Sequence, residues 1–211
     1  MRYDLIIFDF DGTLADSFPF FVDAQNALAR KHRFRTIAPH EIDGLRHLSP
    51  RELMRHVGLS RWRLPLLTRD FIRHMHVHGH AVRMFDGVAP ALQRLHDDGA
   101  RLALVTSNGV ANCRRILGED VMARFAHVEC GASIFGKRRR LRRVLAAAGV
   151  AASRAIYVGD MTPDAEAARD VGMDFAAVGW GYGALDALRA HAPAVVLEHI
   201  DAIAHLRGKD T

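Results

Sequence analysis

The chain has 211 residues, of which 49% are hydrophobic and 25% charged, and its formal net charge is +5. This is the composition of an ordinary globular protein, and the length suits one domain or a core domain with a smaller insert. No run of about 18 apolar residues and no signal-peptide pattern occurs, so we expect no membrane span and a cytoplasmic protein. Cys113 and Cys130 are the only cysteines and form no metal-type pair, so we expect reduced, partly buried thiols.

The first predicted element is a buried strand that ends in carboxylates. Leu5–Phe8 is a short apolar run typical of a parallel strand buried on both faces, and Asp9, Asp11 and Gly12 follow it. Carboxylates are costly to bury there unless a cation or a chemical task compensates them. We expect Asp9 to present an oxygen to an electrophile and Asp11 to exchange a proton, while Gly12 lets the backbone approach a ligand. The alternative is an Asp-Gly surface turn.

A helical stretch follows this strand. Ser17 is a potential N-cap with Pro19 in the first turn, and the pattern then stays helical up to the next linker. No strand pattern interrupts it. We therefore predict a small all-helical domain at 17–81, inserted after the first strand into a core formed by 1–16 and 82–211.

Strands and helices alternate in the rest of the chain. Short apolar runs predict strands, and amphipathic stretches between them predict helices. The predicted strands are 102–106, 127–130, 155–158, 174–178 and 194–197, and the predicted helices are 89–98, 110–117, 137–148 and 163–171. This alternation implies an α/β fold, a Rossmann-like, doubly wound parallel sheet with helices on both faces.

Polar residues stand at or near the carboxyl ends of these strands, where open parallel sheets bind ligands. If the strands are adjacent, these residues meet Asp9 in one crevice. They are Thr106, Ser107, Asn108, Lys137, Asp160 and Asp164.

Their chemistry suits phosphoryl transfer, which needs positioning of the nucleophile and electrostatic cover for the phosphoryl oxygens. Asp9 and Asp160 can hold Mg²⁺, a hard cation that prefers oxygen ligands. Lys137 can neutralise the carboxylates and the transferring group, and Asp164 can orient Lys137 or hold a metal-bound water. The alternative for Asp160 and Asp164 is a loop residue with a helix cap.

Three consecutive residues can donate to phosphoryl oxygens. The donors are the hydroxyl of Thr106, the backbone amide of Ser107 and the side chain of Asn108. Alternatively, Thr106 and Asn108 only cap the next helix.

Four stretches resemble the motifs of the haloacid dehalogenase-like hydrolase superfamily, most closely its phosphoglycolate-phosphatase-like branch. Asp9-Phe-Asp-Gly-Thr-Leu-Ala-Asp-Ser17 is similar to the first motif, Thr106–Asn108 to the second, Lys137 to the third and Gly159–Asp164 to the fourth. The resemblance covers nearly the whole chain. One position departs from it, because Arg138 follows the lysine where many relatives have proline.

The resemblance implies a role for each aspartate. Asp9 would be the nucleophile and a Mg²⁺ ligand, Asp11 the acid/base and a ligand through its backbone carbonyl, and Asp160 a second carboxylate ligand. The insert at 17–81 would be a cap. The dehalogenases lack an aspartate at the place of Asp11, since a halide leaving group needs no proton, so Asp11 favours phosphate esters.

We therefore expect a Mg²⁺-dependent phosphatase that hydrolyses a small phosphomonoester through an aspartyl-phosphate. A phosphoglycolate-like substrate, a sugar phosphate or a nucleotide monophosphate would fit. The alternatives are a phosphomutase or pyrophosphatase on the same site, or a non-catalytic, basic nucleic-acid-binding module. Oligomeric state leaves no signal in the sequence.

Several weaker features keep their alternatives. Three readings of Arg138–Arg143 are open: the solvated face of a helix, a nucleic-acid contact, or a source of positive potential that attracts anionic substrates. The alternating histidines of His74–His80 suit a solvated hinge better than a transition-metal site. Gly179–Gly183 either borders the site or forms a turn. Cap residues proposed to contact the substrate's non-reacting end are Arg46, His47, Arg51 and Arg55.

Overall fold

The computed structural model describes residues 3–48, 50–131 and 136–207. The chain divides into two compact units. Met1–Asp16 with Met84–Thr211 is called the α/β unit below, and Ser17–Arg83 the helical unit. No helix in the described part of the chain combines the length and the apolar character that a membrane span requires.

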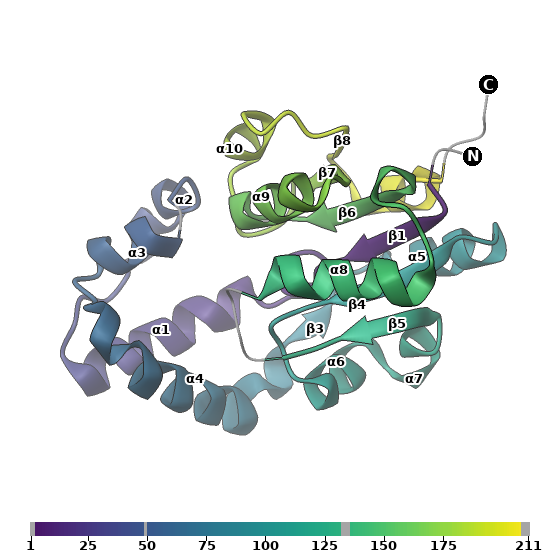
Figure 1. Ribbon diagram of the computed structural model, residues 1–211. Coiled ribbons are helices and arrows are strands. Elements are labelled where there is room, and N and C mark those ends of the chain that lie inside the picture. The colour runs from purple at the N-terminus through teal and green to yellow at the C-terminus, as the bar shows by residue number, and fades with distance from the viewer. Residues whose placement is uncertain (1–2, 49, 132–135, 208–211) are drawn as a thin grey trace. The chain divides into compact units, whose positions relative to one another are not determined.

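A six-stranded sheet forms the centre of the α/β unit (Figure 1). The strands in chain order are β1 (Leu5–Phe8), β4 (Arg101–Val105), β5 (Phe125–Glu129), β6 (Ala155–Gly159), β7 (Asp174–Val178) and β8 (Val195–Leu197). Their spatial order is β5-β4-β1-β6-β7-β8, and each described pairing is parallel. The predicted Rossmann-like parallel sheet is therefore confirmed.

Strand β1 occupies an inner position of this sheet, between β4 and β6. All four of its side chains are fully buried. Leu5 and Ile7 join a hydrophobic cluster with buried side chains of three helices, of which the one at Lys137–Ala148 lies in front of the sheet in Figure 1. Because side chains alternate along a strand, Ile6 and Phe8 face the other side, where the Phe8 ring lies 6.4 Å from that of Phe125. Burial on both faces, worth about 1.5–3 kcal/mol for each large side chain, fixes the strand that carries Asp9.

Among the described residues, the α/β unit contains six α-helices. They are α5 (Val88–Asp97), α6 (Val110–Leu117), α7 (Glu119–Met122), α8 (Lys137–Ala148), α9 (Thr162–Val171) and α10 (Leu185–Arg189). The hydrophobic cluster that contains Leu5 and Ile7 includes side chains of α8, α9 and α10. The short α7 and α10 were not predicted, and neither were the two-residue strands β2 (Ala15–Asp16) and β3 (Arg83–Met84), which form a separate sheet. Elements of two to five residues are too short to show a hydrophobic period.

The helical unit contains α1 (Phe18–His32), α2 (Ile42–Leu45), α3 (Pro50–His56) and α4 (Leu64–His78). The prediction that this stretch is helical throughout was wrong for 34–38, where the backbone has no helix. The side chain of Asn26 explains the difference, because it accepts from the amide of Ile37 at 2.7 Å and donates to its carbonyl at 2.9 Å. Ser17 stands at the N-cap of α1 as predicted, but without a side-chain capping bond.

One histidine of α4, His74, is partly packed rather than fully solvated. The His74 ring lies 5.7 Å from Phe20 and 4.5 Å from His78. Burial lowers the pKa of His74, and the neighbouring His78 adds to this effect. Among the described residues, no histidine belongs to a group of three or more side chains that could hold a metal ion.

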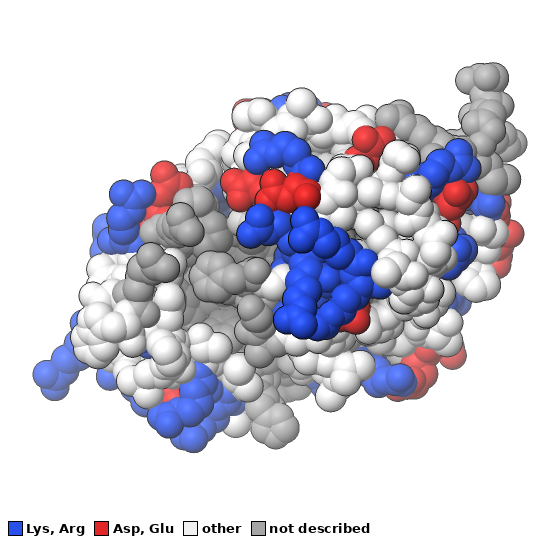
Figure 2. Space-filling model, viewed as in Figure 1, with Lys and Arg blue, Asp and Glu red and all other residues white. Residues whose placement is uncertain are grey.

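The arginines of α8 form a positive patch on the surface in Figure 2. Arg138 pairs with Asp170 at 2.9 Å and Arg143 with Glu129 at 3.2 Å. One arginine departs from the expected solvated face, because Arg140 is buried and donates to the carbonyl of Gly131 at 2.7 Å.

Candidate active site

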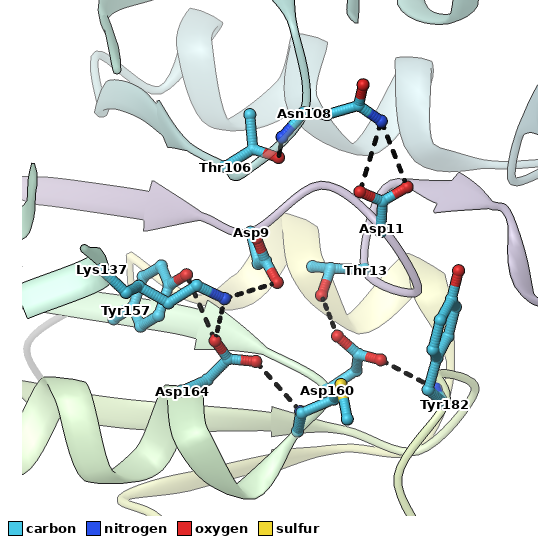
Figure 3. A network of polar contacts seen from close by, with 11 residues as sticks. Asp9, Asp11, Thr13, Thr106, Asn108, Lys137, Tyr157, Asp160, Asp164 and Tyr182 are labelled. Carbon is cyan, nitrogen blue, oxygen red and sulfur yellow. Dashed lines mark hydrogen bonds and ion pairs between the residues drawn. The ribbon is translucent and has the colours of Figure 1, made fainter. Parts of the chain in front are cut away.

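The polar residues expected at the strand ends gather at the carboxyl edge of the sheet (Figure 3). Asp9 follows β1, Thr106 follows β4 and Asp160 follows β6, and these three strands are neighbours in the sheet. Lys137 is the first residue of α8 and enters the same place. All of these residues belong to the α/β unit.

A lysine bridges two buried carboxylates. The ammonium group of Lys137 lies 2.9 Å from Oδ2 of Asp9 and also contacts Oδ1 of Asp164. The latter oxygen accepts from the hydroxyl of Tyr157 at 3.4 Å, and Oδ2 of Asp164 accepts from the amide of Met161 at 3.0 Å. Asp164 therefore contacts Lys137 and also caps the start of α9.

The electrostatics of this cluster follow from its burial. Burial raises the pKa of Asp9 to about 7, and although Lys137 opposes the shift, Asp164 and Asp11 contribute to it. Burial alone would lower the pKa of Lys137, but attraction to Asp164 and Asp9 raises it well above its usual range. The lysine is therefore charged over the physiological range, whereas the Asp9 carboxyl takes up a proton unusually easily.

The carboxylate of Asp160 accepts hydrogen bonds from one hydroxyl and one backbone amide. Its Oδ1 accepts from the hydroxyl of Thr13 at 3.2 Å and its Oδ2 from the amide of Tyr182 at 2.8 Å. A Cβ atom added to Gly12 would lie 2.2 Å from this carboxylate, and one added to Gly181 would lie 2.1 Å from the Cβ of Asp160. The segment 179–183 thus borders the site, which was one of the two predictions for it. Glycine is required at position 12 because the carboxylate of Asp160 lies against it.

The segment after β4 reaches the second aspartate of the first motif. The amide of Asn108 donates to the hydroxyl oxygen of Thr106 at 2.9 Å, and its side-chain amide lies 3.3 and 3.4 Å from the two oxygens of Asp11. Its Oδ1 accepts from the amide of Gly109, the N-cap of α6, at 2.9 Å. Asn108 therefore contacts Asp11, and the alternative that it only caps the next helix is wrong, because the N-cap is Gly109 and no side chain caps α6.

The donor set fits a hard divalent cation. Oxygen atoms of Asp9, Asp160 and Asp164 lie within 4.8 Å of one another, and all three residues are buried. Burial raises the pKa of Asp160 well above its usual range, and Asp164 and Asp9 add repulsion. A cation would relieve this crowding, and Mg²⁺ accepts such carboxylate ligands.

Three contributors were not expected from the sequence. Thr13 and Tyr182 bind Asp160, and Tyr157 supports Asp164. Tyr157 lies inside a buried strand, where its aromatic ring is an ordinary core residue. The signal for Thr13 was its place in the first motif, and that for Tyr182 was the glycine on either side of it.

Comparisons with known proteins agree on the family. The model of the haloacid dehalogenase-like hydrolases matches residues 6–178. The chain is 37% identical over 194 residues to a phosphoglycolate phosphatase of Synechococcus elongatus, covering 92% of both chains. It is 32% identical over 212 residues to the tyrosine-protein kinase PtkA of Mycobacterium tuberculosis, covering 96% of this chain and 71% of that one.

Solved structures agree on the fold. A haloacid dehalogenase-like hydrolase of Streptococcus pneumoniae superposes with a TM-score of 0.81 at 19% identity, over 97% of this chain and 99% of the other. The match over residues 6–178 confirms the resemblance that the four motifs predicted, and the chain belongs to the haloacid dehalogenase-like hydrolase family.

Proposed function

We propose that this hydrolase is a Mg²⁺-dependent phosphatase that cleaves a small phosphomonoester through an aspartyl-phosphate formed on Asp9. The observation that carries the proposal is the buried contact of Asp9 with Lys137, beside Asp160 and at the end of an inner strand. The relatives named phosphoglycolate phosphatase support the activity.

The residues around Asp9 suit an attack on phosphorus. Lys137 binds Oδ2 of Asp9, so Oδ1 is the oxygen that attacks. The ammonium group then offsets the negative charge of the phosphoryl oxygens, which is the main demand of this chemistry. The hydroxyl of Thr106, the amide of Ser107 and the side chain of Asn108 donate to the same oxygens.

Asp11 serves as the acid and base. It is only partly buried and lies at the turn after Asp9, so it can give a proton to the leaving oxygen and later take one from the water that attacks the aspartyl-phosphate. Its contact with Asn108 keeps the carboxyl group oriented while the proton moves.

Asp9 and Asp160 would hold Mg²⁺ through their carboxylates and Asp11 through its backbone carbonyl. When bound, the ion neutralises the phosphoryl oxygens and the crowded carboxylates. Asp164 acts through Lys137, which it positions.

A small substrate is the proposal for specificity. Phosphoglycolate is the first candidate because of the relatives' names, and sugar phosphates and nucleotide monophosphates follow. We propose that the helical unit is a cap that excludes water during the reaction. Contacts to the non-reacting end of the substrate from Arg46, His47, Arg51 and Arg55 stay predictions.

Hydrolysis of an aryl phosphate, with Mg²⁺ and with a chelator, tests the proposal. We expect activity that needs Mg²⁺ and that Asp9→Asn lowers by about 10³-fold or more, because the nucleophile is removed. Asp98→Asn is the matched control, since this carboxylate is exposed at the end of α5. Equal activity of Asp9→Asn and wild type would reject the covalent mechanism.

A panel of phosphate compounds identifies the substrate. It contains 2-phosphoglycolate, hexose phosphates, nucleotide monophosphates and pyrophosphate, compared by kcat/KM. The highest value for pyrophosphate, or isomerisation of a hexose phosphate without release of phosphate, would contradict the proposed reaction.

A further inference from the structure

A groove lies between two helices of the helical unit. α1 and α4 pack side by side (Figure 1), and the Phe20 ring of α1 lies 6.3 Å from the Phe71 ring of α4. The groove between these helices has a volume of about 240 Å³, and each described residue that lines it belongs to α1 or α4. Since a cavity of about 150 Å³ already holds a benzene molecule, this groove has room for one substituted ring.

Part of the lining is apolar or aromatic. Ala27 and Leu28 line the groove from α1, and Val77 lines it from α4. The imidazole rings of His74 and His78 also line it, and their centroids are 4.5 Å apart on successive turns of α4. Flat rings and aliphatic side chains together favour a ligand with a flat, apolar body.

Two cationic side chains line the same groove. They are Lys31 of α1 and Arg73 of α4. Lys31 is paired with Asp70, whereas the exposed Arg73 has no ion pair or hydrogen bond among the described residues. A guanidinium group binds a carboxylate through two parallel hydrogen bonds, so Arg73 favours a ligand with a carboxylate.

One carboxylate oxygen in the groove has no donor. Asp70 lines the groove and is only 5% exposed. Its Oδ2 accepts from Lys31 at 2.6 Å and lies 2.8 Å from Nε2 of His32. Its Oδ1 is buried without a hydrogen-bond partner among the described residues, and Nε of Arg69 lies 3.7 Å from it. A buried acceptor of this kind is unfavourable, and a hydroxyl group of a ligand would satisfy it.

We propose that the groove between α1 and α4 is a binding site for a small aromatic carboxylate with a hydroxyl group. The carboxylate binds Arg73, the hydroxyl donates to Oδ1 of Asp70, and Leu28 and Val77 contact the ring. Lys31 and Arg73 disfavour a metal ion or an ammonium group, which is why the donor is a neutral hydroxyl. This site lies outside the residues around Asp9, and its test does not rest on the proposed function.

Calorimetry on the full chain with 4-hydroxybenzoate tests the site. We expect saturable binding. Benzoate lacks the hydroxyl and phenol lacks the carboxylate, so each should bind about tenfold or more weakly than 4-hydroxybenzoate. This comparison removes one partner at a time from the ligand and leaves the protein unchanged.

Two substitutions place the ligand in the groove. Arg73→Met removes the partner of the carboxylate and should weaken binding of 4-hydroxybenzoate by about tenfold or more. Val77→Glu adds a negative charge to the lining and should weaken it as well. Both side chains are exposed, so neither change disturbs the core. Arg30→Met is the matched control, because this exposed arginine of α1 is not part of the lining, and it should bind like the wild type.

Nuclear magnetic resonance locates the site by a second route. The ring protons of His74 and His78, assigned with the variant His78→Gln, should shift during titration with 4-hydroxybenzoate, because an aromatic ring then lies beside them. Those of His96, which is exposed on α5 in the α/β unit, should not shift.

Several results would overturn the proposal. They are the absence of saturable binding, benzoate or phenol that binds as tightly as 4-hydroxybenzoate, and an affinity that Arg73→Met leaves unchanged. Shifts confined to histidines outside the groove would overturn it too. A chain that binds 4-hydroxybenzoate in this way but hydrolyses no phosphate ester would contradict the proposed function alone.

Discussion

At the scale of single residues, Lys137 controls the charge of the proposed nucleophile. Its ammonium group is the strongest influence that opposes the raised pKa of Asp9. Removing it should raise that pKa above the value of about 7, because burial and the neighbouring carboxylates then act unopposed. In Lys137→Met we therefore expect the acidic limb of the pH–kcat profile to move to higher pH and the maximal kcat to fall by about 10²-fold or more.

Arg138→Met is the control for this substitution. It removes a positive charge from the next position of the same helix, where the side chain is exposed and pairs with Asp170. We expect a profile like that of the wild type. An acidic limb in Lys137→Met that coincides with the wild-type limb would show that the lysine does not set the ionisation of Asp9.

At the scale of elements, the backbone of the segment 179–183 contacts Asp160 and positions it. The amide of Tyr182 binds its carboxylate, and Gly181 leaves no room for a side chain there. In Gly181→Ala the new Cβ would lie 2.1 Å from the Cβ of Asp160, so one of the two must move. We expect the Mg²⁺ concentration at half-maximal activity to rise by about tenfold or more, because a misplaced second ligand weakens metal binding.

Gly44→Ala is the matched control, since an added Cβ there meets no atom within 4 Å. It should leave the Mg²⁺ dependence unchanged and change stability by less than about 1 kcal/mol. A Gly181→Ala enzyme with wild-type affinity for Mg²⁺ would mean that this segment does not position Asp160.

The elements themselves were predictable to different degrees. The helix 137–148 and the strand 174–178 have the bounds expected from the sequence, because Gly149 ends the first and a continuous apolar run marks the second. The non-helical residues 34–38 were missed because their stabilising partner, Asn26, lies in a helix that precedes them. Local periodicity carries no information on such a contact.

The candidate site shows the same division. The expectation that ligand-binding residues lie at the carboxyl ends of adjacent parallel strands gathered Asp9 and Asp160, and Lys137 joins them from the start of α8. The pairing of Tyr182 with Asp160 was beyond its reach, since that contact joins two loops through a backbone amide. The glycines on either side of Tyr182 indicate a turn, but they do not name its partner, because the donor is a backbone amide that every residue except proline carries.

At the scale of the whole molecule, the net charge and the charge of the site have opposite signs. The chain carries +5, yet its candidate site buries several carboxylates around one lysine. Such crowding is unfavourable for the folded state and is retained where function requires it. Stability and activity should therefore compete at this site.

This competition predicts how thermal stability depends on pH and Mg²⁺. The folded-state pKa of Asp9 is about 7 against a usual 3.8, so its stabilising contribution is complete below about pH 4 and is lost as the pH rises through 7. Asp160, with a raised pKa, acts in the same direction. Without Mg²⁺, we therefore expect Asp9→Asn to have a higher Tm than the wild type at pH 8, by about 4 °C for 1–2 kcal/mol, and a much smaller difference at pH 5.

Comparing the Tm of the variant with that of the wild type at each pH cancels the contributions of the other titrating groups to stability. His74 acts with the opposite sign, because its pKa is lowered, and Asp70, with a pKa of about 2, titrates below the range. In the proposed site, Mg²⁺ binds the ionised carboxylates of the folded state, so it should raise the wild-type Tm more at pH 8 than at pH 5 and leave Asp9→Asn nearly unchanged. If Mg²⁺ raised the Tm of both proteins equally, the ion would bind elsewhere. The unfavourable free energy of burying these carboxylates would then need another explanation.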